Sequence, residues 1–430
     1  MKQQLVTATL LAALTLSAAA ETWSYADCVD YALANNISLR KSRLNQETAA
    51  YNLEEARAQW EPTLDFATTQ GFANYPWGDG SKNSYSSSYG FNAGWTVWNG
   101  GSRENTIKRR KIDAEISTVQ TDDAERTLRT DLLQVYLNIL YARESVGVYE
   151  EAARVSGAQA ERGRQLMEAG RASRVDYAQL RSTYEQDCYA LVNARSTYET
   201  RRMELKELLE LGIDTDVELR NVEWTEAQVL AALPALDGSY ALALDNDLQL
   251  RTLALEAEGT DIDVSIAKAS GRPSVSLSAG VGTGYNAPGI SFGRGIKQNF
   301  GENVGVTLSV PILNRKQSKT ATSRAQVQKM EAQLDIDRRT TELGRLVENW
   351  YIDTRSAQSR YTAARQQVEA AELTEQLTSE QFALGLVNPI DLMTAHRDHV
   401  EAQHSMLQAK YMAILGQKMI EYYRTATVAL

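Results

Sequence analysis

The sequence contains little proline and cysteine, and each scarcity limits what the chain can be. Only seven prolines occur in 430 residues, and the stretches 77–233 and 312–388 contain none. Because proline breaks helix interiors, these two tracts, rich in Ala, Gln, Glu, Arg and Leu, predict very long helices. The two cysteines, Cys28 and Cys188, allow at most one disulfide. Their helix-patterned surroundings favour two free thiols.

Long apolar runs and an excess of positive charge are also missing. A membrane-spanning helix needs roughly 20 nearly uncharged apolar residues, and only residues 5–20 approach this pattern. With Lys2 before them and Ala18-Ala19-Ala20 at their end, these residues predict an export signal over 1–20. The chain carries 45 basic and 55 acidic side chains, a formal charge of −10. This balance argues against a nucleic-acid-binding protein.

An internal repeat covers nearly the whole chain. Segment 32–40 matches segment 243–251 at an offset of 211, and an offset of 215 pairs Gly170 with Gly385 and Val175-Asp176 with Ile390-Asp391. The chain is therefore two copies of one unit, 21–211 and 239–430, joined by a linker over 212–238. Each copy predicts a helix, two strands and a long helical hairpin. The strands are expected at 63–75, 85–98, 274–286 and 302–313, and the hairpins at 102–211 and 316–423.

The expected strands alternate in polarity with a period of two. In 304–312, large aliphatic residues alternate with Gly305, Thr307 and Ser309. Strands of this length with apolar or aromatic outer faces and small polar inner faces are typical of membrane barrels. A soluble sandwich, with the apolar faces in one core, is the alternative. Four strands cannot close a barrel, and lipid does not tolerate open edges, so the barrel must be shared; three chains would supply twelve strands.

The long helices carry heptad seams. One runs from Leu128 to Met167, and the other runs in the same register from Val347 to Phe382 and includes Glu375. Helices of about 65 residues would be roughly 100 Å long. A dimeric stalk would also show heptads, but strands attached directly to such helices disfavour a stalk.

No arrangement in the sequence indicates catalysis. The glycine run 280–284 lies inside an expected strand with no helix opening after it, so small lumen-facing residues explain it better than a phosphate loop. The three histidines are His396, His399 and His404, and only the first two share a helix face. A solvated helix is the preferred interpretation over a metal site. The sequence thus predicts no enzyme, no catalytic residue, no cofactor and no metal.

The chain resembles the TolC-like outer membrane efflux protein family, also called outer membrane factors. The resemblance rests on the opening segment 23–36, the duplicated unit, the strand end at 310–314, and the paired Ala-Gly-x4-Val-Asp and Leu-Gly-x4-Ile-Asp turns. It spans about residues 23–423. It implies an α+β fold, mostly long coiled coil, that assembles as a homotrimer with a twelve-strand barrel in the outer membrane and a twelve-helix periplasmic tunnel.

The same resemblance implies the function. Such a protein docks on a periplasmic adaptor and an inner-membrane pump, and it exports small molecules or proteins as the exit duct of a tripartite efflux or type I secretion system. A periplasmic coiled-coil adaptor or a structural stalk is the alternative. Adaptors usually show one hairpin and soluble β domains, whereas this chain shows two hairpins and four amphipathic strands.

The two hairpin turns are the candidate functional site. Gly170 and Gly385 suit the left-handed position that ends a helix, and Ser173 and Asn388 suit the N-cap of the return helix. Asp176 and Asp391 would then close capping boxes and favour the positive helix end, with Pro389 at the first helical position.

By resemblance, these acids line a narrow periplasmic entrance, where family members pair them with a basic residue two positions after the second glycine. This chain has Val387 there, which departs from the pattern and leaves Arg174 as a candidate substitute. Phe382 ends the second seam beside this entrance. At the opposite end of the unit, the aromatic side chains expected at the membrane interface are Trp60, Trp95 and Trp98.

Overall fold

The computed structural model describes residues 22–77, 83–286, 292–428 and 430. The expected export signal lies outside these ranges, as does part of the connection between the strands expected at 63–75 and 85–98. The chain divides into two compact units. The sheet unit comprises Ser42–Thr121 and Leu248–Arg339, and the hairpin unit comprises Asp122–Asp247, Thr340–Leu430 and the residues up to Lys41.

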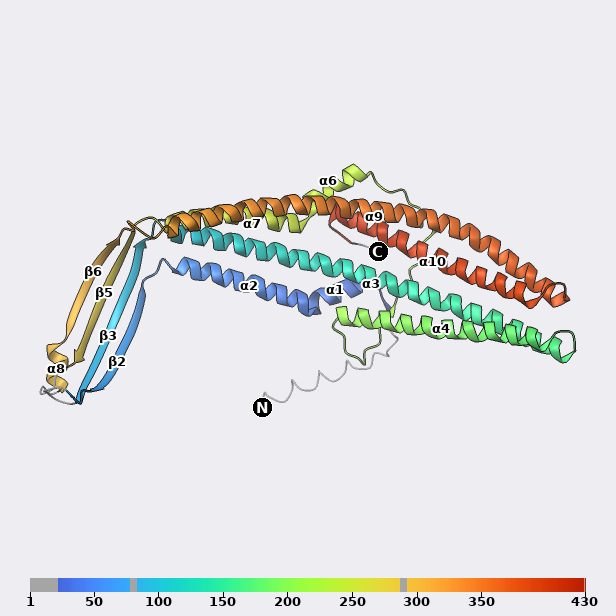
Figure 1. The fold of residues 1–430 in the computed structure, drawn as a ribbon, viewed down its shortest axis with the longest axis horizontal. Coiled ribbons are helices and arrows are strands. Elements are labelled where there is room, and N and C mark those ends of the chain that lie inside the picture. Colours follow the sequence, from blue (N-terminus) through green and yellow to red (C-terminus); the bar gives the residue numbers. More distant parts are fainter. Residues whose placement is uncertain (1–21, 78–82, 287–291, 429) are drawn as a thin grey trace, which may run out of the picture. The chain divides into compact units, whose positions relative to one another are not determined.

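The sheet unit contains one antiparallel sheet of four strands (Figure 1). In the order β2-β3-β5-β6 the strands are β2 (Thr63–Asn74), β3 (Asn83–Trp98), β5 (Ser274–Tyr285) and β6 (Gly301–Ser309). The last strand ends four residues before the predicted boundary at 313. Pro311 has no backbone N–H to donate to a ladder, and it restricts the residue before it, which explains the earlier end.

Two features of this sheet differ from or refine the prediction. A short helix, α8 (Phe292–Gln298), precedes β6 and was not expected. The glycine run lies in β5, where a Cβ on Gly284 would lie 2.6 Å from the carbonyl oxygen of Ser87. Close approach of the β3 backbone therefore accounts for a glycine at this position.

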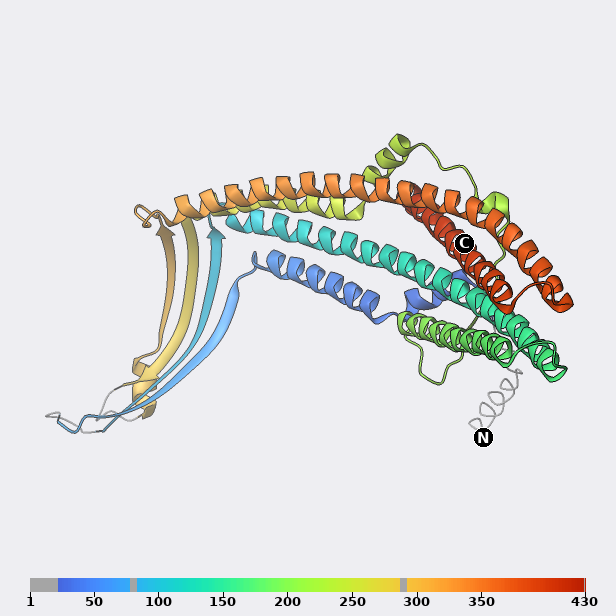
Figure 2. The same cartoon turned by 45° about the vertical axis from the view of Figure 1, so that its right-hand side comes forward.

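Four helical segments adjoin the sheet at one end (Figure 2). These are α2 (Ile37–Ala58), α7 (Leu248–Ala269) and the first parts of α3 (Ser102–Glu168) and α9 (Gln317–Leu384). At this junction the buried Arg103 guanidinium stacks 3.4 Å above the Trp60 ring centroid. It also donates hydrogen bonds to the carbonyl oxygens of Gln59, Thr96 and Val97. One side chain thus ties the end of α2, the end of β3 and the start of α3 together.

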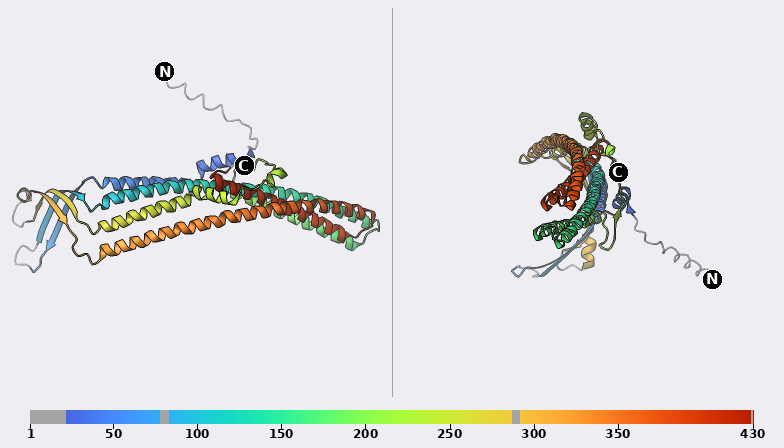
Figure 3. Two further views of the ribbon diagram at one scale, coloured as in Figure 1. Left: turned by 90° about the horizontal axis from the view of Figure 1, so that it is seen from above. Right: turned by 90° about the vertical axis from the view of Figure 1, so that its right-hand side faces the viewer.

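The hairpin unit is built from α3 paired with α4 (Arg174–Leu208) and α9 paired with α10 (Pro389–Thr425) (Figure 3). Each residue of the predicted 4/3 seams between Leu128 and Met167 and between Val347 and Phe382 is buried or half-buried, so the heptad prediction is confirmed. At Gly163 the helices approach so closely that a Cβ would lie 2.5 Å from the Leu180 side chain.

The single helix predicted before the first strand of the first copy is in fact two helices. α1 (Tyr25–Asn35) and α2 meet at Asn36, whose N–H bonds the Ala32 carbonyl while its side chain accepts the Leu39 N–H at 3.0 Å. Asn36 therefore ends one helix and caps the next. The second repeat breaks at the equivalent Asp247, between α6 (Leu236–Asn246) and α7.

The predicted linker 212–238 contains structure of its own. It holds β4 (Glu218–Leu219), which pairs in parallel with β1 (Thr22–Trp23), then α5 (Glu226–Val229) and the start of α6. The mostly helical α+β class is confirmed, with the smaller sheet as predicted. In the described part of the chain, no helix combines the length and the apolar character required to cross a membrane.

Candidate functional site

The first hairpin turn joins α3 to α4 through a complete capping box. Gly170 has φ +71°, and the N–H groups of Arg171 and Ala172 bond the Leu166 carbonyl. The Ser173 hydroxyl accepts the Asp176 N–H at 3.0 Å, and the Asp176 carboxylate accepts the Ser173 N–H at 2.8 Å. This reciprocal pair satisfies two backbone donors that a helix start leaves free.

The second turn, between α9 and α10, is capped from one side only. Gly385 has φ +77°, Pro389 occupies the first turn, and the Asn388 side chain accepts the Asp391 N–H at 3.0 Å. The predicted capping box is wrong here, because Asp391 does not bond back to the Asn388 N–H. Among the described residues the exposed Asp391 carboxylate has no hydrogen bond or ion pair, so its charge is available to other groups.

The two turns are held near each other by a small apolar cluster. Phe382 of α9 packs with Ala160 of α3, Leu180 of α4 and Leu392 of α10, and all four side chains are buried. Val387, which replaces the family's basic residue, packs against this cluster. The position is therefore apolar by packing as well as by sequence, and no ion pair forms through it.

Arg174, the candidate substitute, is exposed and forms no ion pair within the described ranges. The two acids and this arginine are thus placed at the turns without contact among themselves. Inside one protomer the structure brings together the apolar residues of the predicted site and leaves its charged residues separate.

A buried polar network lies further along the same hairpins. His396 of α10 is 2% exposed, and its two ring nitrogens lie 2.6 Å from Glu375 Oε1 and 2.9 Å from Asp187 Oδ2. His399 Nδ1 lies 2.5 Å from the other oxygen of Glu375. The prediction of a solvated helix is therefore wrong for these two histidines.

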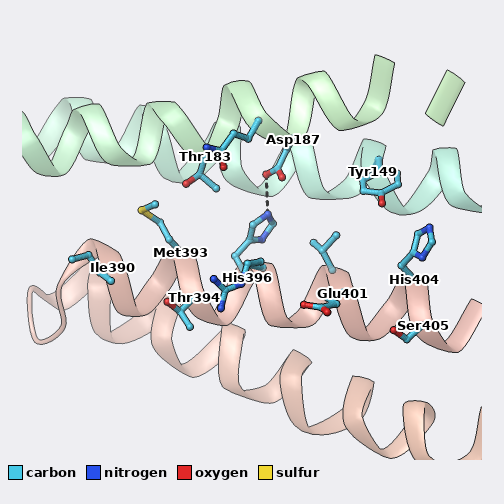
Figure 4. A pocket seen from close by; sticks show the side chains of 13 residues that line it. Tyr149, Thr183, Asp187, Ile390, Met393, Thr394, His396, Glu401, His404 and Ser405 are labelled. Carbon is cyan, nitrogen blue, oxygen red and sulfur yellow. Dashed lines mark hydrogen bonds and ion pairs between the residues drawn. The ribbon is translucent and has the colours of Figure 1, made fainter. Parts of the chain in front are cut away.

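The network connects three helices of the hairpin unit. Glu375 lies on α9 and Asp187 on α4, so His396 links its own hairpin to the other one. Figure 4 shows Asp187 and His396 joined by their hydrogen bond, and both line a groove of about 600 Å³ between α4 and α10. Further along, the Lys410 ammonium group and the Tyr411 hydroxyl both bond Glu144 of α3. Polar contacts therefore join the two hairpins at more than one position along their length.

The electrostatics favour the charged forms of His396 and Glu375. Burial acts to lower the pKa of His396, but hydrogen bonds to Asp187 and Glu375 outweigh it and raise the pKa to about 9. Burial acts to raise the pKa of Glu375, yet the hydrogen bonds from His396 and His399 hold that pKa below its usual value. At neutral pH the site is thus an imidazolium between carboxylates. His404 differs, because burial lowers its pKa.

This network is not arranged as a metal centre. Within the described ranges, no group of three or more His, Cys, Asp or Glu side chains could hold a metal ion. The imidazole nitrogens instead face carboxylate oxygens at hydrogen-bond distance. The heptad pattern held a signal for this site, because Glu375 occupies a core position of its seam, where an acid needs a buried partner.

The predicted interface tryptophans lie where strands meet helices in the sheet unit. Trp60, Trp95 and Trp98 are each about two-fifths exposed, at 44%, 39% and 41%. The Trp95 indole N–H donates to the Trp60 carbonyl at 2.8 Å. Sequence reasoning did not include Arg103, whose guanidinium stacks on Trp60, because a cation in a first helical turn looks solvent-exposed.

Comparison with known proteins assigns the family. The model of the outer membrane efflux protein family matches residues 28–210 and 239–414, which are the bodies of the two repeats. The chain belongs to the outer membrane efflux protein family. The family description makes it an outer-membrane protein, and its fold is shared with solved outer-membrane channels.

Solved structures share this fold at low sequence identity. CusC matches with a TM-score of 0.76 and 16% identity over 93% of this chain and 91% of that one. VceC of Vibrio cholerae matches with a TM-score of 0.76 and 14% identity over 92% and 95%. CmeC of Campylobacter jejuni matches with a TM-score of 0.73 and 17% identity over 94% and 86%.

A curated relative is the alkaline protease secretion protein AprF of Pseudomonas aeruginosa. It is 24% identical over 122 residues, which cover 28% of this chain and about a quarter (25%) of the relative's own length.

Proposed function

We propose that this outer membrane efflux protein is one protomer of a trimeric exit duct without catalysis of its own. The observation that supports it is the open sheet. Each edge strand, β2 and β6, has a single hydrogen-bonded neighbour within the described residues. Lipid leaves unpaired backbone groups unsatisfied, so a sheet with open edges must be completed by other chains.

The surface of the sheet supports the same assembly. Large apolar side chains on its strands are exposed in the protomer, including Leu64 at 71%, Val304 at 78% and Leu308 at 65%. These side chains would face lipid in a barrel. Three protomers give twelve strands, enough for a water-filled lumen, whereas the smallest closed membrane barrels have about eight.

The partners and the entrance follow from the same assembly. A duct in the outer membrane needs a periplasmic adaptor and an inner-membrane pump to receive its cargo, and the similarity to AprF, a secretion protein, fits this class. In a trimer, Asp176 and Asp391 would supply six carboxylates at the periplasmic mouth. A free-standing adaptor or stalk is disfavoured, because neither needs four exposed amphipathic strands.

The test is the mass and conductance of the purified protein. Light scattering in mild detergent should give three chains per particle, and the same fraction should form stable pores in planar bilayers. A monomer that does not conduct would contradict the proposed duct.

A further inference from the structure

The start of α9 carries an unusual run of positive charge. Residues 303–330 contain no Asp or Glu, although the whole chain has an excess of acids. In this run we define the basic collar as the four exposed cations Arg315, Lys316, Lys319 and Arg324. None of the four forms an ion pair in the part of the chain that the structure describes. Each therefore lacks an acidic partner in its own protomer.

The collar lies where the sheet meets the helices. It begins at Arg315 in the connection between β6 and α9 and extends into the first turns of α9. Just before it, Ile312 and Leu313 are 89% and 93% exposed. An apolar surface is thus followed at once by a band of unpaired positive charge.

The backbone conformation at the collar is unfavourable for the residues that occupy it. Arg315 and Lys316 have φ of +52° and +63°, in the left-handed region that disfavours residues with a Cβ. In the first repeat, the equivalent positions at offset 215 are Gly100 and Gly101, with φ of +69° and +85°. The same turn therefore exists in this protein with the residues that suit it, and the second repeat carries cations there instead. Strain of this kind is retained at functional positions.

The helix dipole makes cations at this position still less favourable. The first turn of α9 contains no acid and includes Lys319, although the positive end of a helix dipole favours anions and disfavours cations. Like charges this close in sequence also repel. Neither the local backbone conformation nor an ion pair within the protomer stabilises the cations of the collar. An anion from outside the chain is therefore needed to stabilise them.

We propose that the basic collar binds anionic phospholipid headgroups in the periplasmic leaflet of the outer membrane. The inference rests on the proposed duct, in which the sheet lies in lipid and the helices extend into the periplasm. Trp60, Trp95 and Trp98 are partly exposed at strand–helix junctions of the sheet unit, and such rings favour the headgroup region. Cations beside an anionic membrane surface gain affinity, and this binding offsets the strain and the repulsion.

The test counts lipids retained by the purified trimer. Protein in mild detergent is equilibrated with equal amounts of phosphatidylglycerol and phosphatidylethanolamine, and bound lipids are counted by native mass spectrometry. The collar variant is Arg315→Gly with Lys316→Gly and Lys319→Gln. Its preference for phosphatidylglycerol should fall about 100-fold, since each cation contributes about fivefold.

A matched control removes the same charge elsewhere. Arg40, Lys41 and Arg43 are three exposed cations near the start of α2, well before β2 in the sequence, and their triple change to Gln should leave the preference within about twofold of wild type. Arg315→Gly with Lys316→Gly should unfold at no lower temperature than wild type, because glycine relieves the left-handed strain. Loss of lipid preference in that stable protein supports the proposal directly.

Three results would overturn the proposal, and a fourth would overturn the duct on which it rests. A conducting wild-type trimer without preference for phosphatidylglycerol refutes the collar and leaves the duct intact, whereas a monomer that does not conduct refutes the duct itself. An equal loss in the control and collar variants shows general charge rather than a site. Displacement of phosphatidylglycerol by inorganic phosphate at equal concentration assigns the collar to free phosphate instead of lipid.

Discussion

The buried imidazole of His396 makes the contact between the two hairpins depend on pH. It is bonded on both sides to carboxylates, Glu375 on its own hairpin and Asp187 on the other. His399 bonds the same glutamate, and His404, eight residues further along, lies against Tyr141 and Tyr149 instead. Replacing His396 by Gln keeps a polar side chain and leaves the two carboxylates without the cation.

The sign and the size of this pH dependence follow from the pKa of His396. In the fold the pKa of His396 is about 9, raised from an ordinary value of 6.5, so protonation is favoured by folding. The difference corresponds to about 3 kcal/mol. This stabilisation is fully present below pH 6.5 and is lost as the pH rises through 9. Glu375, whose pKa is lowered, contributes above its ordinary value and loses that contribution as the pH falls through its folded pKa.

Amide hydrogen exchange in α10 measures this contact locally. After correction for the intrinsic exchange rate, protection around residue 396 should fall by about 100-fold between pH 6 and pH 9.5, which is the equivalent of about 3 kcal/mol. The variant His396→Gln should be less protected at pH 6 and change little with pH. His404→Gln is the control and should keep the wild-type pH dependence. The same pH dependence in wild type and in His396→Gln would refute the assignment.

Further predictions concern the entrance, the membrane interface and the hairpin packing. Asp391→Asn with Asp176→Asn keeps most of the capping and removes the charge, so trimers should persist while planar-bilayer recordings show reduced cation selectivity; unchanged selectivity would leave a capping role alone. A variant that retains only Trp95 should be quenched by brominated lipid, and an unquenched ring would contradict the interface placement. Gly163→Ala places a Cβ 2.5 Å from a buried leucine and should lower stability by about 1–3 kcal/mol in thermal unfolding. Gly147→Ala, with no atom within 4 Å, should not be destabilising.

Periodic features of the sequence were sufficient to predict the architecture. The 4/3 seams, the period-two strands and the repeat offsets are local or regular, and the structure has helices and strands close to those expected. The predicted element boundaries are wrong where a single side chain, and not a regular pattern, determines the backbone conformation. Asn36 splits one predicted helix because its side chain caps the next helix, and Pro311 ends β6 early.

The spacing of residues along one helix was not enough to predict the buried polar network. Asp187 and His396 are separated by 209 positions, and their contact exists only once two hairpins pack. The angle between His396 and His399 on α10 says nothing about which groups face them from α4 and α9. The acid at seam position 375 was the one local indication, because a buried carboxylate in a coiled coil requires a partner.

The two repeats differ most clearly at the strand–helix junction. In the first repeat, Trp60 and Arg103 stack, whereas offsets of 211 and 215 place Gly271 and Ser318 at the equivalent positions. A Cβ on Gly271 would lie 2.7 Å from the Ser318 hydroxyl oxygen, so this pair is packed as closely as its larger counterpart. The two members of each pair are matched in size, a large pair in the first repeat and a small pair in the second.

The positive charge at the junction is buried in the first repeat and exposed in the second. In the first, the turn is Gly100-Gly101 and the cation, Arg103, is buried against strand carbonyls. In the second, the turn itself carries Arg315 and Lys316, and both side chains are exposed. The backbone of the turn is the same in both, so duplication preserved its geometry while the side chains diverged. One junction binds strand ends together, and by our proposal the other binds headgroups. A gene fusion that repeats the first half twice should therefore keep the sheet and lose the preference for anionic lipid.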